Sequence, residues 1–357
     1  MSATDTKRPV PQGVRLGRMS FVWRPWLVLV TLLLAAATFL VFCLSIGAGD
    51  FPIPLPRVIA TLAGRGERVD KFVIMDLRLP RALAGLVVGI ALGTSGAITQ
   101  SIARNPLASP DVLGITQGAG AVAVILLTVS GGATAAIAGS VGVPAAALAG
   151  GLGTGLLVYL LAWRRGIDGF RLILIGISVS AVMQAITTWV LVTADITDVA
   201  RAQAWLVGSL DGRSWDEVGP AIGCTLVLLA VAAGAAFQFR PMHFGDEVAA
   251  GLGVRYSAVR AVMLLCAVLL AGAAVSAAGP VPFVALVAPQ AAMRLARWST
   301  PPLAASGLVG ALLLIGADVV ARTALPVTLP VGVVTAAIGG PFLVYLLVRA
   351  NLRQAAA

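Results

Sequence analysis

The stretch WLVLVTLLLAAATFLVFCLSIGA occupies residues 26–48 and contains no charged side chain. An α-helix needs about 20 mostly apolar residues to cross the ~30 Å hydrocarbon core of a bilayer. The stretch therefore predicts a membrane-spanning helix. It is too long for the apolar core of a signal peptide and no small-residue cleavage site follows it, so we expect the helix to be retained.

The composition indicates that the whole chain is a membrane protein. Its 357 residues are 59% hydrophobic and 11% charged, with a mean hydropathy of +0.98, whereas soluble domains carry roughly 25% charged residues. We therefore predict an all-α fold, a polytopic transmembrane bundle. Its spans are expected at about 26–48, 81–102, 112–130, 134–162, 170–193, 218–238, 258–278, 282–296, 303–321 and 331–349.

Basic residues decide the orientation of the bundle, because they are enriched in the cytoplasmic connections of membrane proteins. Ten spans put both termini on one side, and the connections on that side hold most of the 25 basic residues. We expect a flexible cytoplasmic tail over 1–25, one transmembrane domain over 26–350 and a cytoplasmic tail over 351–357. The protein is thus predicted in the cell (inner) membrane. Its net charge of +10 then faces anionic lipid and cytosolic partners rather than nucleic acid.

Catalytic and metal-binding motifs are absent from the sequence. It contains no P-loop, and its glycine cluster at 150–155 lies within an apolar span, where close helix packing is the simpler explanation. The single histidine, His243, has no second histidine or thiol nearby, and Cys43, Cys224 and Cys266 lack metal-ligand spacing. We predict no catalytic residue, no metal site and no bound cofactor. The expected activity is transport, with energy supplied by another protein.

A first polar connection surrounds the second span. Pro80 suits a helix start, and Gly93 and Gly96 allow close backbone approach. The turn sequence Arg104-Asn105-Pro106-Leu107 predicts a tight cytoplasmic hairpin, with a new helix beginning near Asp111. This arrangement is a helix hairpin, and only the outer arginines, Arg78 and Arg81, have no role in forming it.

A second polar connection, the longest on the cytoplasmic side, runs from residue 240 to residue 260. Acidic residues followed by a short apolar run and a glycine are typical of a brief capped helix. Such a helix could lie on the lipid surface or dock a soluble partner, and its composition favours neither. The segment comprises Gly245, Asp246, Glu247, Val248, Ala249, Ala250, Gly251, Leu252 and Gly253.

The third polar feature is the pair Asp318 and Arg322. These residues lie one helical turn apart at the end of the ninth span. An acid within the membrane is a functional hypothesis by default. An ion pair at this spacing can also serve only to neutralise a buried charge within the helix. We favour this second interpretation for Asp318, while Arg322 can also reach the outer face.

These motifs together resemble the FecCD/BtuC family of permease subunits from binding-protein-dependent ABC importers. The resemblance rests on RLPR at 78–81, RNPLASPDVLG at 104–114, GDEVAAGLGV at 245–254, AGPVPFVALVAP at 278–289 and ADVVAR at 317–322. It extends over roughly residues 30–350. Within the family, the ferric enterobactin permeases are most similar.

The resemblance implies a BtuC-like (type II) importer fold of ten helices per subunit and several partners. These are two ATPase subunits that bind ATP and Mg²⁺, a second homologous permease (a different chain or a second copy), and an extracytoplasmic siderophore-binding protein. It assigns Arg78, Arg81 and Arg322 to docking of the binding protein, and residues 245–253 to coupling with the ATPase. It also implies that the fifth span lines the pathway, where Gln184, Thr187 and Thr188 lie.

The cargo implied is a ferric siderophore of the catecholate type, with vitamin B12 or haem as alternatives within the family. An ion-coupled secondary transporter is the alternative from another class. Such proteins couple through intramembrane acids or histidines, and Asp318 beside Arg322 is the only deep acid predicted. Gln290 departs from the family pattern, since many relatives carry histidine after the Ala-Pro motif.

Overall fold

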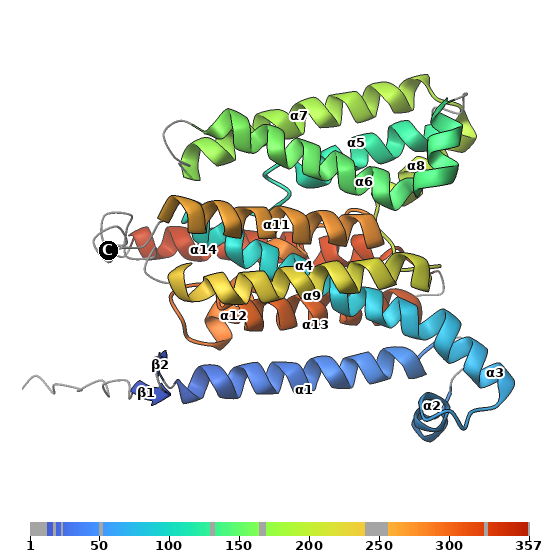
Figure 1. Cartoon of the computed structure of the whole chain (residues 1–357), viewed down its shortest axis with the longest axis horizontal. Coiled ribbons are helices and arrows are strands. Elements are labelled where there is room, and N and C mark those ends of the chain that lie inside the picture. The colour runs from blue at the N-terminus through green and yellow to red at the C-terminus, as the bar shows by residue number, and fades with distance from the viewer. Residues whose placement is uncertain are drawn as a thin grey trace, which may run out of the picture.

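The computed structural model describes residues 13–16, 19–22, 24–49, 53–128, 133–163, 169–239, 256–324 and 328–355. Long helices run side by side along the bundle, with α1 along one edge and α5 to α8 at the other (Figure 1). The elements are β1 Gly13–Leu16, β2 Met19–Val22, α1 Pro25–Gly47, α2 Leu55–Leu62, α3 Arg68–Lys71, the π-helix η1 Phe72–Arg78, α4 Leu79–Ala103, α5 Ile115–Thr128, α6 Ala133–Ala162, α7 Gly169–Thr193, α8 Ile196–Leu206, α9 Trp215–Phe239, α11 Tyr256–Ala278, α12 Val284–Leu295, α13 Leu303–Thr323 and α14 Val331–Ala355.

Each predicted span corresponds to a helix. Among the described residues, 8 helices are long and apolar enough to cross a membrane. The third and eighth predicted spans, α5 and α12, are shorter than expected at 14 and 12 residues. Turns replace the start of each: Gly114 N–H bonds to Asp111 O before α5, and Phe283 adopts a left-handed φ of 67° before α12.

Helix α4 is the centre of the bundle and packs against α13, α11, α12 and α9. Small residues make these contacts possible, because a Cβ on Gly96 would lie 1.8 Å from Ala285 O and one on Gly93 would lie 2.2 Å from Ser306 O. The predicted close approach at Gly93 and Gly96 is therefore confirmed. Helix α1 contributes little to the core, since only 17% of its apolar window is buried.

Pro80 is the second residue of α4 (Leu79–Ala103), as expected for a helix start, but the chain is already helical before it, and one continuous helix of 36 residues runs from Arg68 to Ala103. Its segment before Pro80 is the π-helix η1, in which Leu79 N–H bonds to Ile74 O. In that register the Met75 carbonyl would pair with residue 80, but proline has no N–H. Trp215 Nε1 donates to Met75 O instead, at 2.9 Å.

Two further local differences from the sequence expectations are present. Helix α6 is broken at Gly142, whose φ of 74° and ψ of 159° are not helical, so the membrane-crossing part begins there. Within the region expected to be a flexible tail, β1 and β2 form an antiparallel hairpin that pairs Gly13 with Val22 and Leu16 with Met19. These strands are outside the all-helical bundle.

Candidate functional site

The three outer arginines predicted to dock a binding protein gather at one end of the bundle. Arg81 projects from the start of α4 and donates from Nε and Nη2 to Asp318 Oδ1 of α13, at 3.1 and 2.9 Å. Its Nη1 atom pairs with the carboxylate of Asp211, in the loop before α9. Arg81 is thus held by two acids that lie 237 and 130 residues away in the sequence.

Arg322 and Arg78 satisfy the last carbonyls of α1. Arg322 donates to Ser45 O and to Ala48 O, both at 3.1 Å, and Arg78 donates to Ile46 O at 2.9 Å. The final carbonyls of a helix lack intrahelical partners and carry partial negative charge. Because α1 has no basic residue in its own last turn, these two arginines from other helices cap it.

Asp318 lies at the centre of this outer cluster, which we define as Arg78, Arg81, Asp211, Asp318 and Arg322. Arg322 Nε reaches Asp318 Oδ2 at 3.1 Å, and the Asp318 side chain is 3% exposed. The interpretation of Asp318 and Arg322 as a charge-settling pair is confirmed. Arg78 and Arg81, which the hairpin does not account for, both make contacts with other helices at this end of the bundle.

Asp211 is the member of the outer cluster that the sequence did not indicate. Its side chain is 77% exposed, in contrast to Asp318. The loop that carries it is tied to two other helices, because Ser209 N–H bonds to Ala278 O and Gly332 N–H bonds to Gly208 O. Gly208 has φ +74° and a Cβ there would lie 2.1 Å from Pro280 O, so only glycine fits.

The predicted hairpin Arg104–Leu107 lies at the opposite end of the bundle. Arg104 adopts a left-handed φ of 49° and its N–H bonds to Gln100 O, which ends α4. Asn105 Oδ1 then accepts from Leu107 N–H at 2.9 Å, which closes the turn. The tight turn is therefore confirmed, although the next helix begins at Ile115 rather than near Asp111.

Asp111 follows this hairpin and accepts a hydrogen bond from the Thr116 hydroxyl. Burial raises the pKa of the Asp111 carboxyl above its ordinary value of 3.8, and the hydrogen bond from Thr116 opposes that shift only in part. The carboxylate is thus placed where its charged form is disfavoured.

Gln290 lies in a buried amide bridge between α12 and α4. Its Nε2 donates to Gln100 Oε1 at 2.7 Å, and Gln100 Nε2 donates to Leu286 O at 3.1 Å. Arg294 Nη1 also donates to Gln290 O at 2.7 Å. The departure from the family pattern at position 290 thus provides a hydrogen-bonded contact with the central helix.

The three candidate pathway residues are placed differently on α7. Gln184 and Thr188 lie on its exposed face. Thr187 is 3% exposed and donates to Met183 O within the helix. Of the three candidates, Gln184 and Thr188 are therefore the two that lie on the surface of the chain.

The coupling segment, from Gly245 to Gly253, lies outside the described residues. Among the residues that are described, no group of three or more His, Cys, Asp or Glu side chains could hold a metal ion.

Comparisons with known proteins place these features in a wider context. Residues 33–349 match the model of the FecCD transport family. The chain is 41% identical to the ferric enterobactin transport system permease protein FepG of Escherichia coli, over 92% of this chain and 98% of that protein. It is 40% identical to the achromobactin transport system permease protein CbrC of Dickeya dadantii, over 85% of this chain and 87% of that protein. An inward-facing structure of a metal-chelate type ABC transporter has a TM-score of 0.76 at 24% identity, and covers 90% of this chain and 99% of that one, so the fold is shared.

Proposed function

The chain belongs to the FecCD transport family, and from this premise we propose that it is the permease subunit of an ATP-driven importer for a ferric siderophore of the catecholate class. The observation that carries the proposal is the match to FepG across almost the whole of both chains. The cargo would pass from a binding protein to the cytoplasm by alternating access. A separate ATPase would bind ATP and Mg²⁺ and hydrolyse the nucleotide.

The outer cluster is the proposed docking site of the binding protein. Arg78, Arg81 and Arg322 match the family's docking arginines, and acidic residues on the two lobes of the binding protein would meet them. The geometry supports a central role for Arg81, because one of its two carboxylate partners, Asp211, is mostly exposed. An incoming carboxylate could take the place of Asp211 without disturbing Asp318.

The proposed ATPase contact is the segment Gly245–Gly253, which follows α9 and precedes α11 in the sequence. Two ATPase subunits and a second, homologous permease would complete the complex. The exposed positions of Gln184 and Thr188 support a pathway along α7, between the two permeases.

An ion-coupled secondary transporter is the weaker candidate. It would need an intramembrane acid that can exchange a proton or bind a cation during the cycle. Asp318 is poorly suited to this, because Arg81 and Arg322 together occupy both of its carboxylate oxygens.

Reconstitution tests the proposed function. The chain is assembled with its partner permease and ATPase in liposomes, and uptake of iron-labelled ferric enterobactin delivered by the binding protein is measured. Uptake should require ATP and be lost when the P-loop lysine of the ATPase is replaced. Equal uptake without ATP or with the inactive ATPase would reject the importer. Uptake of haem or vitamin B12 in place of the siderophore would reject only the cargo.

Deletion of Asp246–Ala250 tests the coupling segment in the same liposomes. We expect the variant to insert and assemble while ATP hydrolysis no longer drives uptake. Deletion of an equal length from the N-terminal tail, residues 3–7, controls for loss of chain length. Normal uptake by the Asp246–Ala250 variant would contradict the coupling role.

A further inference from the structure

The first helix, α1, lies at the edge of the bundle and buries little of its own surface. Only 17% of its apolar window is buried. In its middle, Val30 and Leu34 pack with residues of α12 and α13, and Thr38 Oγ1 donates to Leu308 O of α13 at 3.3 Å. A helix with so narrow a packed face depends strongly on the polar contacts at its two ends.

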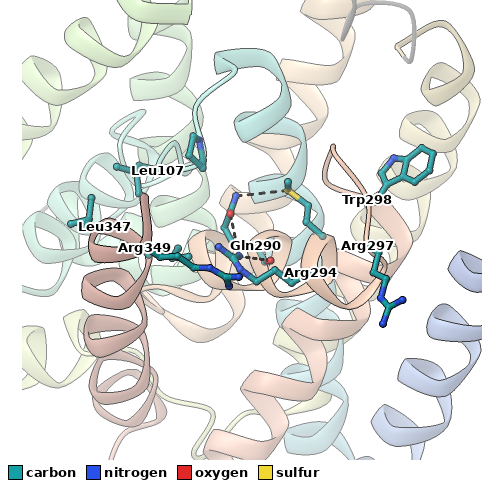
Figure 2. Close-up of a pocket in the computed structure, with 10 residues that line it drawn as sticks. Leu107, Gln290, Arg294, Arg297, Trp298, Leu347 and Arg349 are labelled. Atoms are coloured by element: carbon teal, nitrogen blue, oxygen red, sulfur yellow. Dashed lines mark hydrogen bonds between the residues drawn. The ribbon is translucent and has the colours of Figure 1, made fainter. Parts of the chain in front are cut away.

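The start of α1 is held by a reciprocal pair of arginine–tryptophan contacts. Arg24 Cζ lies 3.6 Å from the centre of the Trp298 ring, and Arg297 Cζ lies 5.0 Å from the centre of the Trp26 ring. Arg297 and Trp298 project from the turn that follows α12 (Figure 2). Trp26 Nε1 also donates to Leu295 O at 3.1 Å. A cation this close to an aromatic face is attracted to it, so this end is fastened by groups at the opposite end of the bundle from the outer cluster.

The last turn of α1 is held instead by Arg322 of the outer cluster. Arg322 Nη1 donates to Ala48 O at 3.1 Å, and Nη2 donates to Ser45 O at 3.1 Å and to Ser45 Oγ at 3.0 Å. On its own helix, Arg322 Nε reaches Asp318 Oδ2 at 3.1 Å. Arg78 donates to a further carbonyl of the same turn of α1. The proposed docking arginines therefore also cap this helix.

The burial of Arg322 decides which of its partners can be exchanged. Its side chain is 10% exposed, so a carboxylate from another protein can reach it only where a present partner moves aside. Asp318 is firmly placed, because it is 3% exposed and also accepts from Arg81 Nη2 at 2.9 Å. The carbonyls of α1 are neutral, and a guanidinium binds a carboxylate more strongly than a neutral carbonyl. These carbonyls are therefore the partners that an incoming carboxylate replaces.

We propose that docking of the binding protein displaces the last turn of α1, while the start of the helix stays attached to α12. This inference rests on the docking site proposed above and adds a response to it. The carboxylate and the α1 carbonyls compete for the same N–H groups of Arg322, and water at the outer surface can satisfy the released carbonyls. Ile46 is packed with residues of α2, η1 and α4, so we expect the turn to shift without unfolding.

Spin labels measure this movement in the complex assembled in nanodiscs, with all native cysteines replaced by alanine. Leu44 and Leu29 lie near the two ends of α1 and are 56% and 46% exposed, and Leu160 of α6, 60% exposed, is the common reference. Binding protein loaded with ferric enterobactin should shift the Leu44–Leu160 distance distribution and leave the Leu29–Leu160 distribution unchanged. High salt, which screens exposed ion pairs, should reverse the shift.

Arg322→Gln removes the cap without any binding protein. We expect it to shift the Leu44–Leu160 distribution in the same direction as docking does. Thr38→Val is the matched control, because it removes a hydrogen bond to α13 from the middle of the same helix and leaves Arg322 in place. An equal shift in Thr38→Val would show that any weakening of α1 moves its end, and would overturn the competition for Arg322.

Surface plasmon resonance on the same nanodiscs gives the Kd of the binding protein. Binding with an unchanged Leu44–Leu160 distribution would overturn this inference and leave the docking site intact. Equal shifts of the Leu44 and Leu29 distributions would show that the whole helix moves, and would also overturn it. A failure of the binding protein to bind would overturn the docking site and the inference together.

Discussion

Asp211 and Asp318 both pair with Arg81, but the two ion pairs differ in how deeply the carboxylate is buried. Asp318 is enclosed between Arg81 and Arg322 with 3% of its side chain exposed. Removing such a buried partner leaves charge uncompensated and is strongly destabilising. Asp211 is 77% exposed, and a pair of this kind contributes at most about 1 kcal/mol. Only the contact with Asp211 can be exchanged easily for a carboxylate from another protein.

We therefore expect Asp211→Asn to strengthen docking of the binding protein. Without its exposed competitor, Arg81 should bind an incoming carboxylate about two- to fivefold more tightly, the factor equivalent to a surface ion pair. The Kd is measured by surface plasmon resonance on nanodiscs, at low and high salt. Among the described residues Arg81 pairs with Asp211 and Asp318, so Asp216→Asn is the control, because it removes a different exposed acid at the start of α9. Equal effects of the two substitutions would mean that net charge, and not competition for Arg81, controls docking.

Asp111 makes stability depend on pH. Its pKa is raised in the folded protein, so the folded state binds the proton more tightly than the unfolded state. The stability therefore falls as pH rises from the ordinary value of 3.8 toward the raised pKa, and above it the penalty is constant. Asp111→Asn keeps the acceptor for Thr116 but removes the charge. We expect a higher thermal unfolding midpoint than wild type at pH 7, with the difference shrinking toward pH 4.

Asp195→Asn is the control for the pH measurement, because it removes one exposed carboxylate from the connection between α7 and α8. It should change the unfolding midpoint little at either pH. If Asp111→Asn behaves in the same way, the charged form of Asp111 is not disfavoured in the folded protein.

At the scale of elements, the sequence predicted where helices lie better than how they are built. Apolar windows located each span, because length and hydropathy are properties of the local sequence. The π-helix before Pro80 was not predictable, since the free Met75 carbonyl is satisfied by Trp215, which lies 140 residues later. The late start of α5 was missed because residues 112–114 are apolar, and an apolar turn looks like helix in a hydropathy window. The eighth span, interrupted by Pro289, was expected to be short, and α12 has 12 residues.

Two glycines of α13 provide a test of the packing at the centre of the bundle. A Cβ on Gly310 would lie 2.2 Å from Gly89 O of α4, whereas one on Gly316 would meet nothing within 4 Å. Gly310→Ala must therefore push two helix backbones apart and should cost about 1–3 kcal/mol, as overpacking usually does. Gly316→Ala adds the same methyl group to the same helix and should be neutral or slightly stabilising.

The comparison is made by thermal unfolding of both variants in the same detergent, with uptake as a second readout. Equal midpoints for Gly310→Ala and Gly316→Ala would contradict the close contact between α4 and α13.

At the scale of the whole molecule, the two ends of the bundle have different chemistry. The outer cluster joins the last turn of α1 to α4 and α13 through Arg78, Arg81 and Arg322. At the other end, Trp26 of α1 meets the last turn of α12. The distribution of basic residues was enough to predict that the ends differ. The pairing of Arg81 with Asp211 was not predictable, because nothing in a single sequence indicates which loop acid approaches which helix.

Labelling of introduced cysteines tests the predicted orientation. Ile196 lies at the start of α8, 85% exposed, on the side of the outer cluster, and Ser299 is exposed in the connection after α12, on the side of the hairpin Arg104–Leu107. In a background with Cys43, Cys224 and Cys266 replaced by alanine, a membrane-impermeant maleimide should label Ile196→Cys in intact spheroplasts. Ser299→Cys should be labelled only in inverted vesicles, because the positive-inside rule places it in the cytoplasm. The reverse pattern would put the outer cluster inside the cell, where no extracytoplasmic binding protein could reach it, and would contradict the proposed docking site.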